Sequence, residues 1–114
     1  MRAVSALALV LLLVPLSASA KTINVRGEGV ATCTAWTREH TDKTTRYPVQ
    51  DSWLLGYVNA VAGMLDVPGV DDVSATFHNA DLVTWMSEYC VAHPDDVVIL
   101  AADALMRELA RLAK

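Results

Sequence analysis

The feature that most constrains the fold is a pair of cysteines, Cys33 and Cys90, the only two in the chain and far apart in the sequence. In an exported protein an even number of cysteines indicates disulfide bonding, and two cysteines allow a single pairing. A bridge across so long a loop would stabilise the folded state by on the order of 4 kcal/mol in the chain-entropy model. That is a large share of the roughly 5–15 kcal/mol by which small domains are stable. The alternative, a reactive thiol paired with a histidine, lacks the local signature of a cysteine enzyme.

The first residues have the pattern of a cleavable export signal. Arg2 gives a positive start, the stretch 3–16 is apolar, and Ala18-Ser19-Ala20 is a small-residue cleavage site. The apolar run is shorter than the roughly 20 residues that a membrane span needs, although an uncleaved anchor helix is the alternative. We predict a signal peptide over residues 1–20 that is cleaved after Ala20.

The chain is small and acidic. It has 114 residues and a formal net charge of −4, and removal of Arg2 with the signal makes the mature chain one unit more negative. This length gives one domain, which buries only a little over half of the surface that its unfolded chain exposes, so a covalent staple would help it. An acidic protein does not favour nucleic acid or anionic membranes, and neither is expected as a partner.

Hydrophobic periodicity predicts an all-α domain over residues 32–114, built from three main helices and a short N-terminal helix and closed by the disulfide. The short helix is expected over 32–39, and the main helices over 51–65, 79–91 and 94–114. Residues 21–31 are polar and contain glycine. We expect them to form an extended N-terminal arm, with a small strand as the alternative.

The helix expected over 51–65 has the clearest pattern. Its apolar residues recur at helical spacing: Trp53, Leu54, Tyr57, Val58, Val61, Met64 and Leu65. Gly56, Ala60 and Gly63 form a second stripe of small residues. Glycine inside a helix costs about 0.5–1 kcal/mol relative to alanine, so the stripe suggests that another backbone approaches closely. The sequence leaves open whether that backbone belongs to the same chain or to a second copy.

Capping residues and apolar faces define two further helices. Thr32 is a suitable N-cap for the short helix, on which Cys33 and Trp36 share a face. Asn79 or Asp81 is expected to cap the helix over 79–91. That helix has a continuous apolar stripe of Leu82, Trp85, Met86, Tyr89 and Cys90. Cys90 is therefore expected to point into the core, where a bridge to the short helix is feasible.

The last helix is expected to begin at Pro94, because proline suits the first turn of a helix. Asp95 and Asp96 would then lie in that first turn, where the helix dipole favours acids. Basic residues in the last turns, among them Arg107 and Arg111, match the opposite end of the dipole.

No group of residues in the sequence indicates a specific chemistry. His40, His78 and His93 are far from one another in sequence and lack metal-binding spacings. The serines do not lie in a nucleophile elbow, and there is no glycine-rich phosphate loop. Basic patches with interleaved aromatic residues, typical of nucleic-acid binding, are also missing. We therefore expect no enzymatic activity, no catalytic residue, no metal and no cofactor.

The local feature with a potential role is the stretch 66–72, which reads D-V-P-G-V-D-D. Asp66, Asp71 and Asp72 make this proline-stiffened loop acidic, so that it could enter a basic cleft on a partner protein. The more ordinary interpretation is a solvated turn, since clusters of Gly, Pro and Asp are typical of turns.

Four motifs, in this order, resemble a known family: Cys33-x-x-Trp36, the stretch W-L-L-G-Y-V over 53–58, the stretch W-M-x-x-Y-C over 85–90, and His93-Pro94 before an alanine-rich last helix. They resemble the small periplasmic Rap/Tai immunity proteins associated with type VI secretion. More loosely, they are similar to the acid-stress chaperone HdeA. The resemblance covers the chain from Cys33 to about Leu109.

The Rap/Tai resemblance implies a periplasmic, non-enzymatic protein that binds and blocks a cognate toxin, typically a peptidoglycan amidase, and that often works as a homodimer. Members of the family insert a loop into the catalytic cleft of the toxin, and Asp66, Asp71 and Asp72 are the candidates for that contact here. The resemblance to HdeA implies an alternative, an acid-activated chaperone. An uncharacterised envelope protein is the third possibility.

Overall fold

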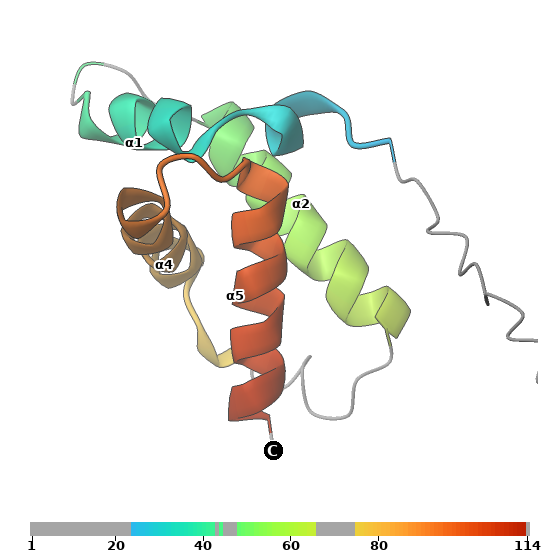
Figure 1. The fold of residues 1–114 in the computed structure, drawn as a ribbon. Coiled ribbons are helices and arrows are strands. Elements are labelled where there is room, and N and C mark those ends of the chain that lie inside the picture. Colours follow the sequence, from blue (N-terminus) through green and yellow to red (C-terminus); the bar gives the residue numbers. More distant parts are fainter. Residues whose placement is uncertain (1–23, 43, 45–47, 66–74, 114) are drawn as a thin grey trace, which may run out of the picture.

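The computed structural model describes residues 24–42, 44, 48–65 and 75–113. These residues contain four α-helices and one short 3-10 helix, and no strand is found among them. In chain order the elements are η1 (Gly27–Val30), α1 (Cys33–Thr41), α2 (Pro48–Leu65), α4 (Asn79–Ala92) and α5 (Val98–Leu112) (Figure 1). The predicted all-α fold, with three main helices and a short one before them, is confirmed. The predicted signal peptide lies outside the described residues.

α5 stands at the centre of the molecule, with α2 and α4 on either side, and α1 crosses the end at which α5 begins (Figure 1). α1 packs chiefly on α4, while α2 and α4 both pack on α5. The helices enclose one core, whose largest fully buried side chains are Trp36, Leu54, Met86, Leu105, Leu109, Val98, Cys33 and Cys90. Among the described residues, no helix combines the length and the apolar character needed to cross a membrane.

α1 starts as the sequence predicts, with Thr32 as its N-cap. The Thr32 hydroxyl oxygen accepts a hydrogen bond from the Ala35 backbone N–H at 3.1 Å. This bond satisfies one of the amide groups that a helix start leaves without an intrahelical partner. Cys33 and Trp36 follow one turn apart and are both fully buried. The first turn of α1 is therefore fixed to the core.

The last helix begins later than predicted. The sequence predicts a start at Pro94, whereas α5 begins at Val98. Val97 is extended, with φ −91° and ψ 153°, and it pairs with Thr32 in an isolated antiparallel bridge. An extended residue cannot continue a helix. The predicted position of Asp95 and Asp96 in the first helical turn is therefore wrong.

The stretch before α5 is a turn that leads into the extended Val97, and the start of α1 uses the backbone of this turn. The Cys33 N–H donates to the Asp96 carbonyl at 2.7 Å, and the Thr34 N–H donates to the Pro94 carbonyl at 3.1 Å. Both donors lie in the first turn of α1, where N–H groups have no partner inside the helix. Residues distant in sequence thus supply these acceptors, and neither segment alone predicts the arrangement.

The predicted extended arm over residues 21–31 is wrong for its second half. Gly27–Val30 forms the 3-10 helix η1, which packs against α2 and α5. Gly27 has a φ of +68°, which favours glycine. A Cβ atom on Gly29 would lie 2.5 Å from Cζ2 of Trp53. The two glycines therefore let the chain turn tightly over the Trp53 ring.

Two helix starts differ in detail from the prediction. α2 begins at Pro48 instead of residue 51, consistent with the preference of proline for the first turn. At α4 the N-cap position belongs to His78, not to Asn79 or Asp81. Asp81 still takes part, because its carboxylate accepts a hydrogen bond from the His78 N–H at 2.9 Å. This is the reciprocal half of a capping box.

The stripe of small residues on α2 faces outward. Gly56, Ala60 and Gly63 are all exposed. A Cβ atom built on Gly56 or on Gly63 would have no neighbour within 4 Å. In the part of the chain that the structure describes, no second helix approaches this stripe.

Candidate partner-binding surface

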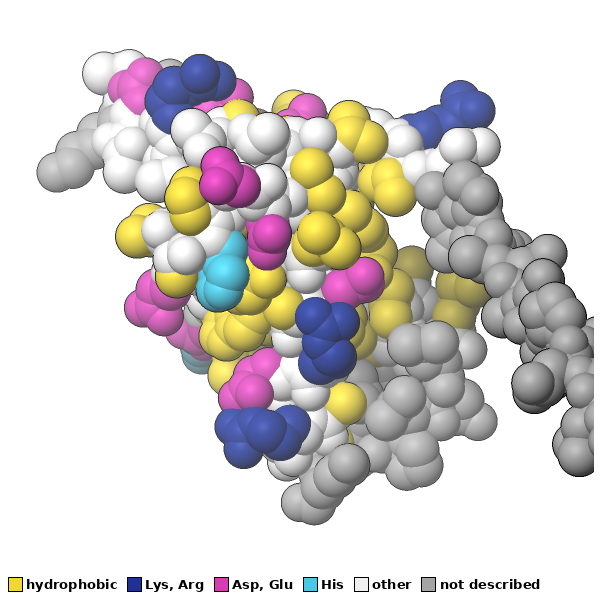
Figure 2. Space-filling model, in the orientation of Figure 1, with side chains coloured by type: hydrophobic (Ala, Val, Ile, Leu, Met, Phe, Trp, Pro, Cys, Tyr) yellow, Lys and Arg dark blue, Asp and Glu magenta, His cyan; other side chains and the backbone are white. Residues whose placement is uncertain are grey.

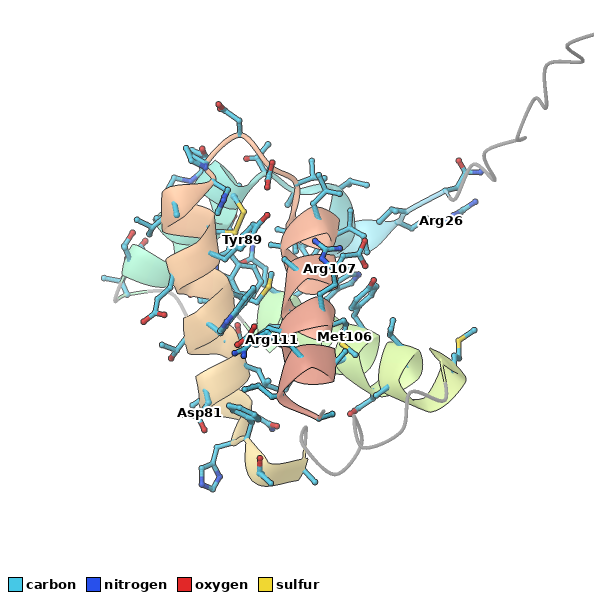
Figure 3. All side chains as sticks on the ribbon, turned by 60° about the horizontal axis from the view of Figure 1, so that its bottom comes forward. Arg26, Asp81, Tyr89, Met106, Arg107 and Arg111 are labelled. Atoms are coloured by element: carbon cyan, nitrogen blue, oxygen red, sulfur yellow. A yellow bond between two sulfur atoms is a disulfide. The ribbon has the colours of Figure 1, made fainter. Side chains whose placement is uncertain are left out.

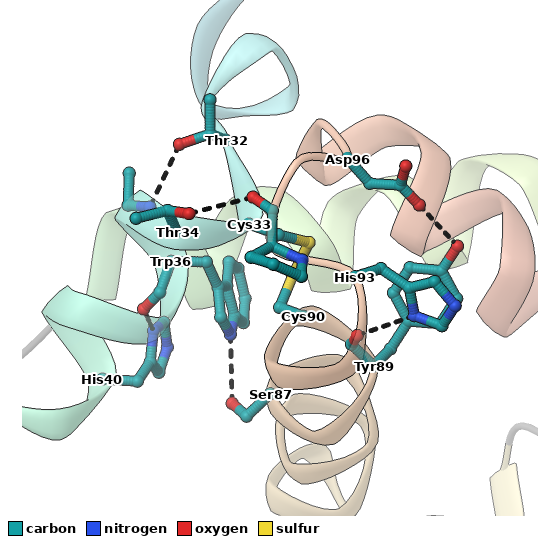
Figure 4. The surroundings of a disulfide bond; sticks show 12 residues. Thr32, Cys33, Thr34, Trp36, His40, Ser87, Tyr89, Cys90, His93 and Asp96 are labelled. Atoms are coloured by element: carbon teal, nitrogen blue, oxygen red, sulfur yellow. Dashed lines mark hydrogen bonds between the residues drawn. A yellow bond between two sulfur atoms is a disulfide. The ribbon is translucent and has the colours of Figure 1, made fainter.

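The disulfide joins α1 to α4 (Figure 4), at the end of the molecule where α5 begins (Figure 1). Cys33 and Cys90 are bonded to each other, their Cα atoms are 4.6 Å apart, and both side chains are fully buried. The predicted pairing is confirmed, and the chain has no free cysteine. Because the bridge has no exposed surface, its role is to hold the two helices together.

Trp36 adds a second link between the same two helices. Its indole N–H donates to the Ser87 hydroxyl oxygen at 3.0 Å. The Ser87 hydroxyl in turn donates to the Val83 carbonyl, one turn earlier in α4, at 2.9 Å. Trp36 is fully buried, so its polar N–H group needs a partner. The Ser87 oxygen provides that partner, so the Ser87 hydroxyl both accepts and donates a hydrogen bond within the protein.

His40 links α1 to α2 and packs on the buried Trp36. Its ring stacks on the Trp36 indole, with ring centroids 4.1 Å apart. The ring nitrogen Nδ1 lies 2.9 Å from the Trp36 carbonyl oxygen, and Nε2 lies 2.8 Å from the Asp51 carboxylate. The two ring nitrogens thus connect His40 to the backbone of its own helix and to a side chain of α2.

Ser87, His40 and Asp51 are the residue types of a hydrolase triad, but their geometry does not activate a nucleophile. A triad requires a histidine nitrogen that accepts the serine proton. Here the two His40 nitrogens face the Trp36 carbonyl and Asp51, while the Ser87 proton goes to Val83. The three side chains therefore act as fastenings between helices.

Gln50 of α2 connects η1, α1 and α2 by hydrogen bonds of its side chain. It is buried, with 3% of its surface exposed. Its amide nitrogen donates to the carboxylates of Glu28, at 3.3 Å, and Glu39. The two N–H groups of one amide are thus both satisfied, and they connect η1, α1 and α2. The hydrogen bonds bring together residues that are far apart in sequence.

Two tyrosines fasten the other helices to α5 and the turn before it. The Tyr89 hydroxyl of α4 donates to the Asp96 carboxylate at 2.8 Å, and its ring stacks on His93 at a centroid distance of 4.0 Å. The hydrogen bond to Asp96 raises the pKa of the Tyr89 phenol. Tyr89 lies between α4 and α5, and Arg107 projects from α5 nearby (Figure 3).

On the opposite side of α5, the Tyr57 hydroxyl of α2 donates to the Asp103 carboxylate. Burial, reinforced by this hydrogen bond, raises the pKa of the Tyr57 phenol well above its usual value. A neutral phenol that donates to a carboxylate resists ionisation because the phenolate would lose the bond and face a like charge. Tyr57 therefore holds α2 on α5 in its neutral form.

Between α1 and α4 the surface has a groove beside the disulfide. It consists of two adjoining hollows of about 470 and 330 Å³, which share Val91. The residues that line the α1–α4 groove are Thr34, Thr37, Arg38, His40, Val83, Thr84, Ser87, Glu88, Cys90, Val91 and Pro94. Val91 is 67% exposed, with Arg38 and Glu88 nearby to offer opposite charges. An apolar centre with a polar rim is typical of surfaces that bind other proteins.

The predicted partner-binding residues Asp66, Asp71 and Asp72 lie outside the described residues. The sequence prediction missed His40, Asp51 and Ser87 as contributors to this end. The i, i+4 spacing of Trp36 and His40 could have indicated their stacking. Nothing in the sequence indicates the contact of His40 with Asp51.

Within the described ranges, no group of three or more His, Cys, Asp or Glu side chains could hold a metal ion. Comparison with known proteins finds no family model, no curated protein and no solved structure that matches this chain.

Proposed function

We propose that this protein is exported to the periplasm, where it binds a cognate secreted enzyme of the peptidoglycan-amidase class and blocks its active site. The disulfide is compatible with an oxidising compartment, and the amino-terminal pattern supports export. The protein would act without catalysis of its own, as the resemblance to the Rap/Tai immunity proteins implies.

The observation that carries this proposal is the location of the motif residues. Cys33, Trp36, Tyr89, Cys90 and His93 all lie at one end of the molecule, where each makes a defined contact (Figure 4). These contacts hold α1 and α4 in a fixed relation. A surface that is ordered before binding loses less conformational entropy on association, which favours tight inhibition.

Two surfaces are candidates for the contact with the enzyme. The first is the acidic stretch that contains Asp66, Asp71 and Asp72, which would enter the catalytic cleft. The second is the α1–α4 groove around Val91. Either surface could bind the enzyme without the other. Substitutions confined to one of the two surfaces show which of them makes the contact.

The test is first whether a reading frame beside this protein encodes a secreted amidase, and then whether this protein inhibits the peptidoglycan hydrolysis by that amidase at neutral pH. We expect the wild-type protein to abolish hydrolysis at a one-to-one ratio. The variant D66N/D71N/D72N tests the acidic stretch and Val91→Glu tests the groove. Leu100→Glu is the matched control for the groove, since Leu100 is also exposed, at 48%, but lies on α5. Full hydrolysis in the presence of wild-type protein would contradict the proposal.

A second candidate is an HdeA-like chaperone for acid stress. It is favoured by the chemistry of the interhelical hydrogen bonds: Tyr57–Asp103, Tyr89–Asp96 and His40–Asp51 all use a carboxylate as the acceptor. Protonation of these carboxylates in strong acid would weaken all three links together and loosen the helices. A chaperone should suppress aggregation of unrelated proteins at about pH 2–3 and not at pH 7. Equal suppression at both pH values, or none, would exclude it.

A further inference from the structure

The α1–α4 groove is a surface that is already formed before a partner binds. Its two hollows, of about 470 and 330 Å³, adjoin at Val91. Cys90, fully buried and bonded to Cys33, forms part of the floor of the smaller hollow. Ser87 lines the larger hollow, and its hydroxyl accepts a hydrogen bond from the Trp36 indole at 3.0 Å. These two links hold α1 and α4 in place, so binding requires little ordering of the groove.

The hollows offer a partner mainly apolar surface. Val91, where they adjoin, is 67% exposed. The Thr34 hydroxyl donates to the Pro94 carbonyl at 2.9 Å. The Ser87 hydroxyl donates to the Val83 carbonyl at 2.9 Å. Because these lining hydroxyls are already bonded within the protein, the groove is suited to apolar side chains.

The charges of the groove lie in different hollows. Arg38 lines the smaller hollow and Glu88 the larger one. Among the described residues, no ion pair joins Arg38 to Glu88. Arg38 lies 3.7 Å from Glu39, its neighbour in the chain, yet 74% of the Arg38 side chain is exposed. Such an exposed ion pair contributes little, so both charges of the groove are available to a partner.

The charges of α5 are arranged differently. Arg111 donates to Glu108, one turn earlier on the same helix, at 2.8 Å. These two opposite charges therefore neutralise each other locally. On the face formed by α4 and α5, acidic and basic side chains lie among the hydrophobic ones (Figure 2). The α1–α4 groove differs in that its opposite charges are separated and stand beside apolar hollows.

We propose that the α1–α4 groove receives one amphipathic helix of the enzyme that this protein inhibits, an inference that rests on the proposed function. Two apolar side chains of that helix, three or four positions apart, fill the two hollows. Side chains at this spacing lie on one face of a helix, with Cβ atoms about 5–6 Å apart, which suits two hollows that share one valine. The described residues contain no strand that would offer an edge to an extended segment.

The separated charges fix the direction in which the helix lies. An acidic residue of the helix stands beside Arg38 and a basic residue beside Glu88. The reverse direction would bring like charges together at both ends of the groove, which disfavours it. The apolar hollows thus provide affinity, and the two charges provide specificity.

The test is the affinity of the purified, disulfide-bonded protein for the secreted amidase identified beside it, measured by isothermal titration calorimetry. Arg38→Glu and Glu88→Arg should each weaken binding by about 10-fold or more, because each change places like charges together. Arg26→Glu is the matched control for Arg38→Glu and should bind as the wild type does. Arg26 is also exposed, but it lies on the other side of α5 from α4 (Figure 3). Circular dichroism verifies that each variant is folded.

The double variant R38E/E88R distinguishes this arrangement from a general attraction by net charge. Its two changes cancel in net charge but reverse the two ends of the groove. We expect it to bind no more tightly than either single variant. If the amidase responded to net charge alone, one single variant would bind more tightly and the other more weakly than the wild type, and the double variant would equal the wild type. That result would overturn the proposal.

Photocrosslinking identifies the element of the amidase that enters the groove. Benzoylphenylalanine in place of Thr84, which is exposed and lines the larger hollow, should attach to a helix of the amidase that has apolar residues three or four positions apart. The same group in place of Leu100, on α5, is the control and should not attach to that helix. Attachment from position 84 to an extended loop would overturn the helical assignment.

The outcomes separate this inference from the proposed function. An amidase that is inhibited equally by the wild type and by every groove variant would overturn the inference alone. An amidase that the wild-type protein neither binds nor inhibits would overturn both.

Discussion

The disulfide end and the outward face of α2 differ in how far their residues are buried and in the contacts that these residues make. At the disulfide end, Cys33 and Trp36 are fully buried, and they contact Cys90 and Ser87 of α4. On the outward face of α2, Val49 and Met64 are exposed, and the glycines touch no side chain of the described chain. The first region shows what holds the fold together, and the second shows sequence features that the isolated fold does not require.

The glycines make the same comparison at the level of single residues. Gly27 has a positive φ and Gly29 lies against Trp53, so the fold itself requires glycine at both positions. Gly56 and Gly63 lie in regular helix with open space beside them. Among the described residues, nothing near Gly56 or Gly63 requires glycine at these two positions.

Removal of the disulfide should have the largest effect on the free energy of unfolding. The bridge spans 57 residues, and in the chain-entropy model its loss reduces the free energy of unfolding by about 4 kcal/mol. The variant C33A/C90A should show this loss in urea unfolding monitored by tryptophan fluorescence. The reduced wild-type protein is the control and should lose a similar amount. If the bridged and unbridged proteins were equally stable, the disulfide end would not be the main fastening.

Gly29→Ala should come next, with a loss of about 1–3 kcal/mol in the free energy of unfolding from overpacking. The new Cβ would lie 2.5 Å from Trp53 and 2.7 Å from Val25, so one of these side chains must move. The measurement is again urea unfolding, together with the shift of tryptophan emission. Unchanged stability would show that η1 does not hold Trp53 in place.

Tyr57→Phe should reduce the free energy of unfolding by about 1 kcal/mol at neutral pH, through the loss of one hydrogen bond. Because the pKa of Tyr57 is raised in the folded protein, the unfolded chain releases this proton first as the pH increases. The contribution of Tyr57 is thus complete below the ordinary tyrosine pKa of about 10, and it is lost as the pH rises above that value.

Wild-type stability should accordingly fall more steeply between about pH 9 and 11 than that of Tyr57→Phe, as measured by urea unfolding at each pH. Tyr89→Phe is a parallel test within the same fold, because the pKa of Tyr89 is also raised and the loss of its hydroxyl should act in the same direction. Parallel pH profiles for wild type and Tyr57→Phe would contradict the role assigned to the Tyr57–Asp103 link.

Gly63→Ala should have the smallest effect and the opposite sign. In dilute solution it should raise the free energy of unfolding by about 0.5–1 kcal/mol, since alanine is the better helix former and its methyl group meets nothing within 4 Å. Thermal unfolding at the lowest practical concentration measures this gain. The contrast with Gly29→Ala sharpens the difference between glycines that the fold needs and those that it does not. Destabilisation by Gly63→Ala in dilute protein would show that this glycine has a role inside the chain.

The helices could be predicted because their apolar spacing is a local pattern. The disulfide could be predicted because only one pairing of the cysteines is possible. The apolar spacing around Trp53 and Leu54 is visible in the chain itself, and two cysteines have only one way to pair. The start of α5 could not be predicted in this way. Pro94 and Asp95 are good first-turn residues, but the carbonyl of Pro94 serves the start of α1 instead.

The candidate surface was harder to predict than the fold. The contact of His40 with Asp51 and the two carboxylates on Gln50 join residues from different elements. No spacing in the sequence encodes such contacts, since they depend on how the helices cross. Asp66, Asp71 and Asp72 were predicted to bind a partner, and that remains a prediction.

By itself the sequence determined that this protein is helical and that Cys33 must pair with Cys90, because periodicity and cysteine number leave few alternatives. Only the tertiary structure decided that the small residues of α2 face outward while its other side fills the core. The physical reason is that both sides of α2 are apolar, so hydrophobicity alone does not distinguish them. The packing of α2 on α5 and α4 selects the side that carries Leu54 and Val58, and it leaves Gly56 and Met64 exposed.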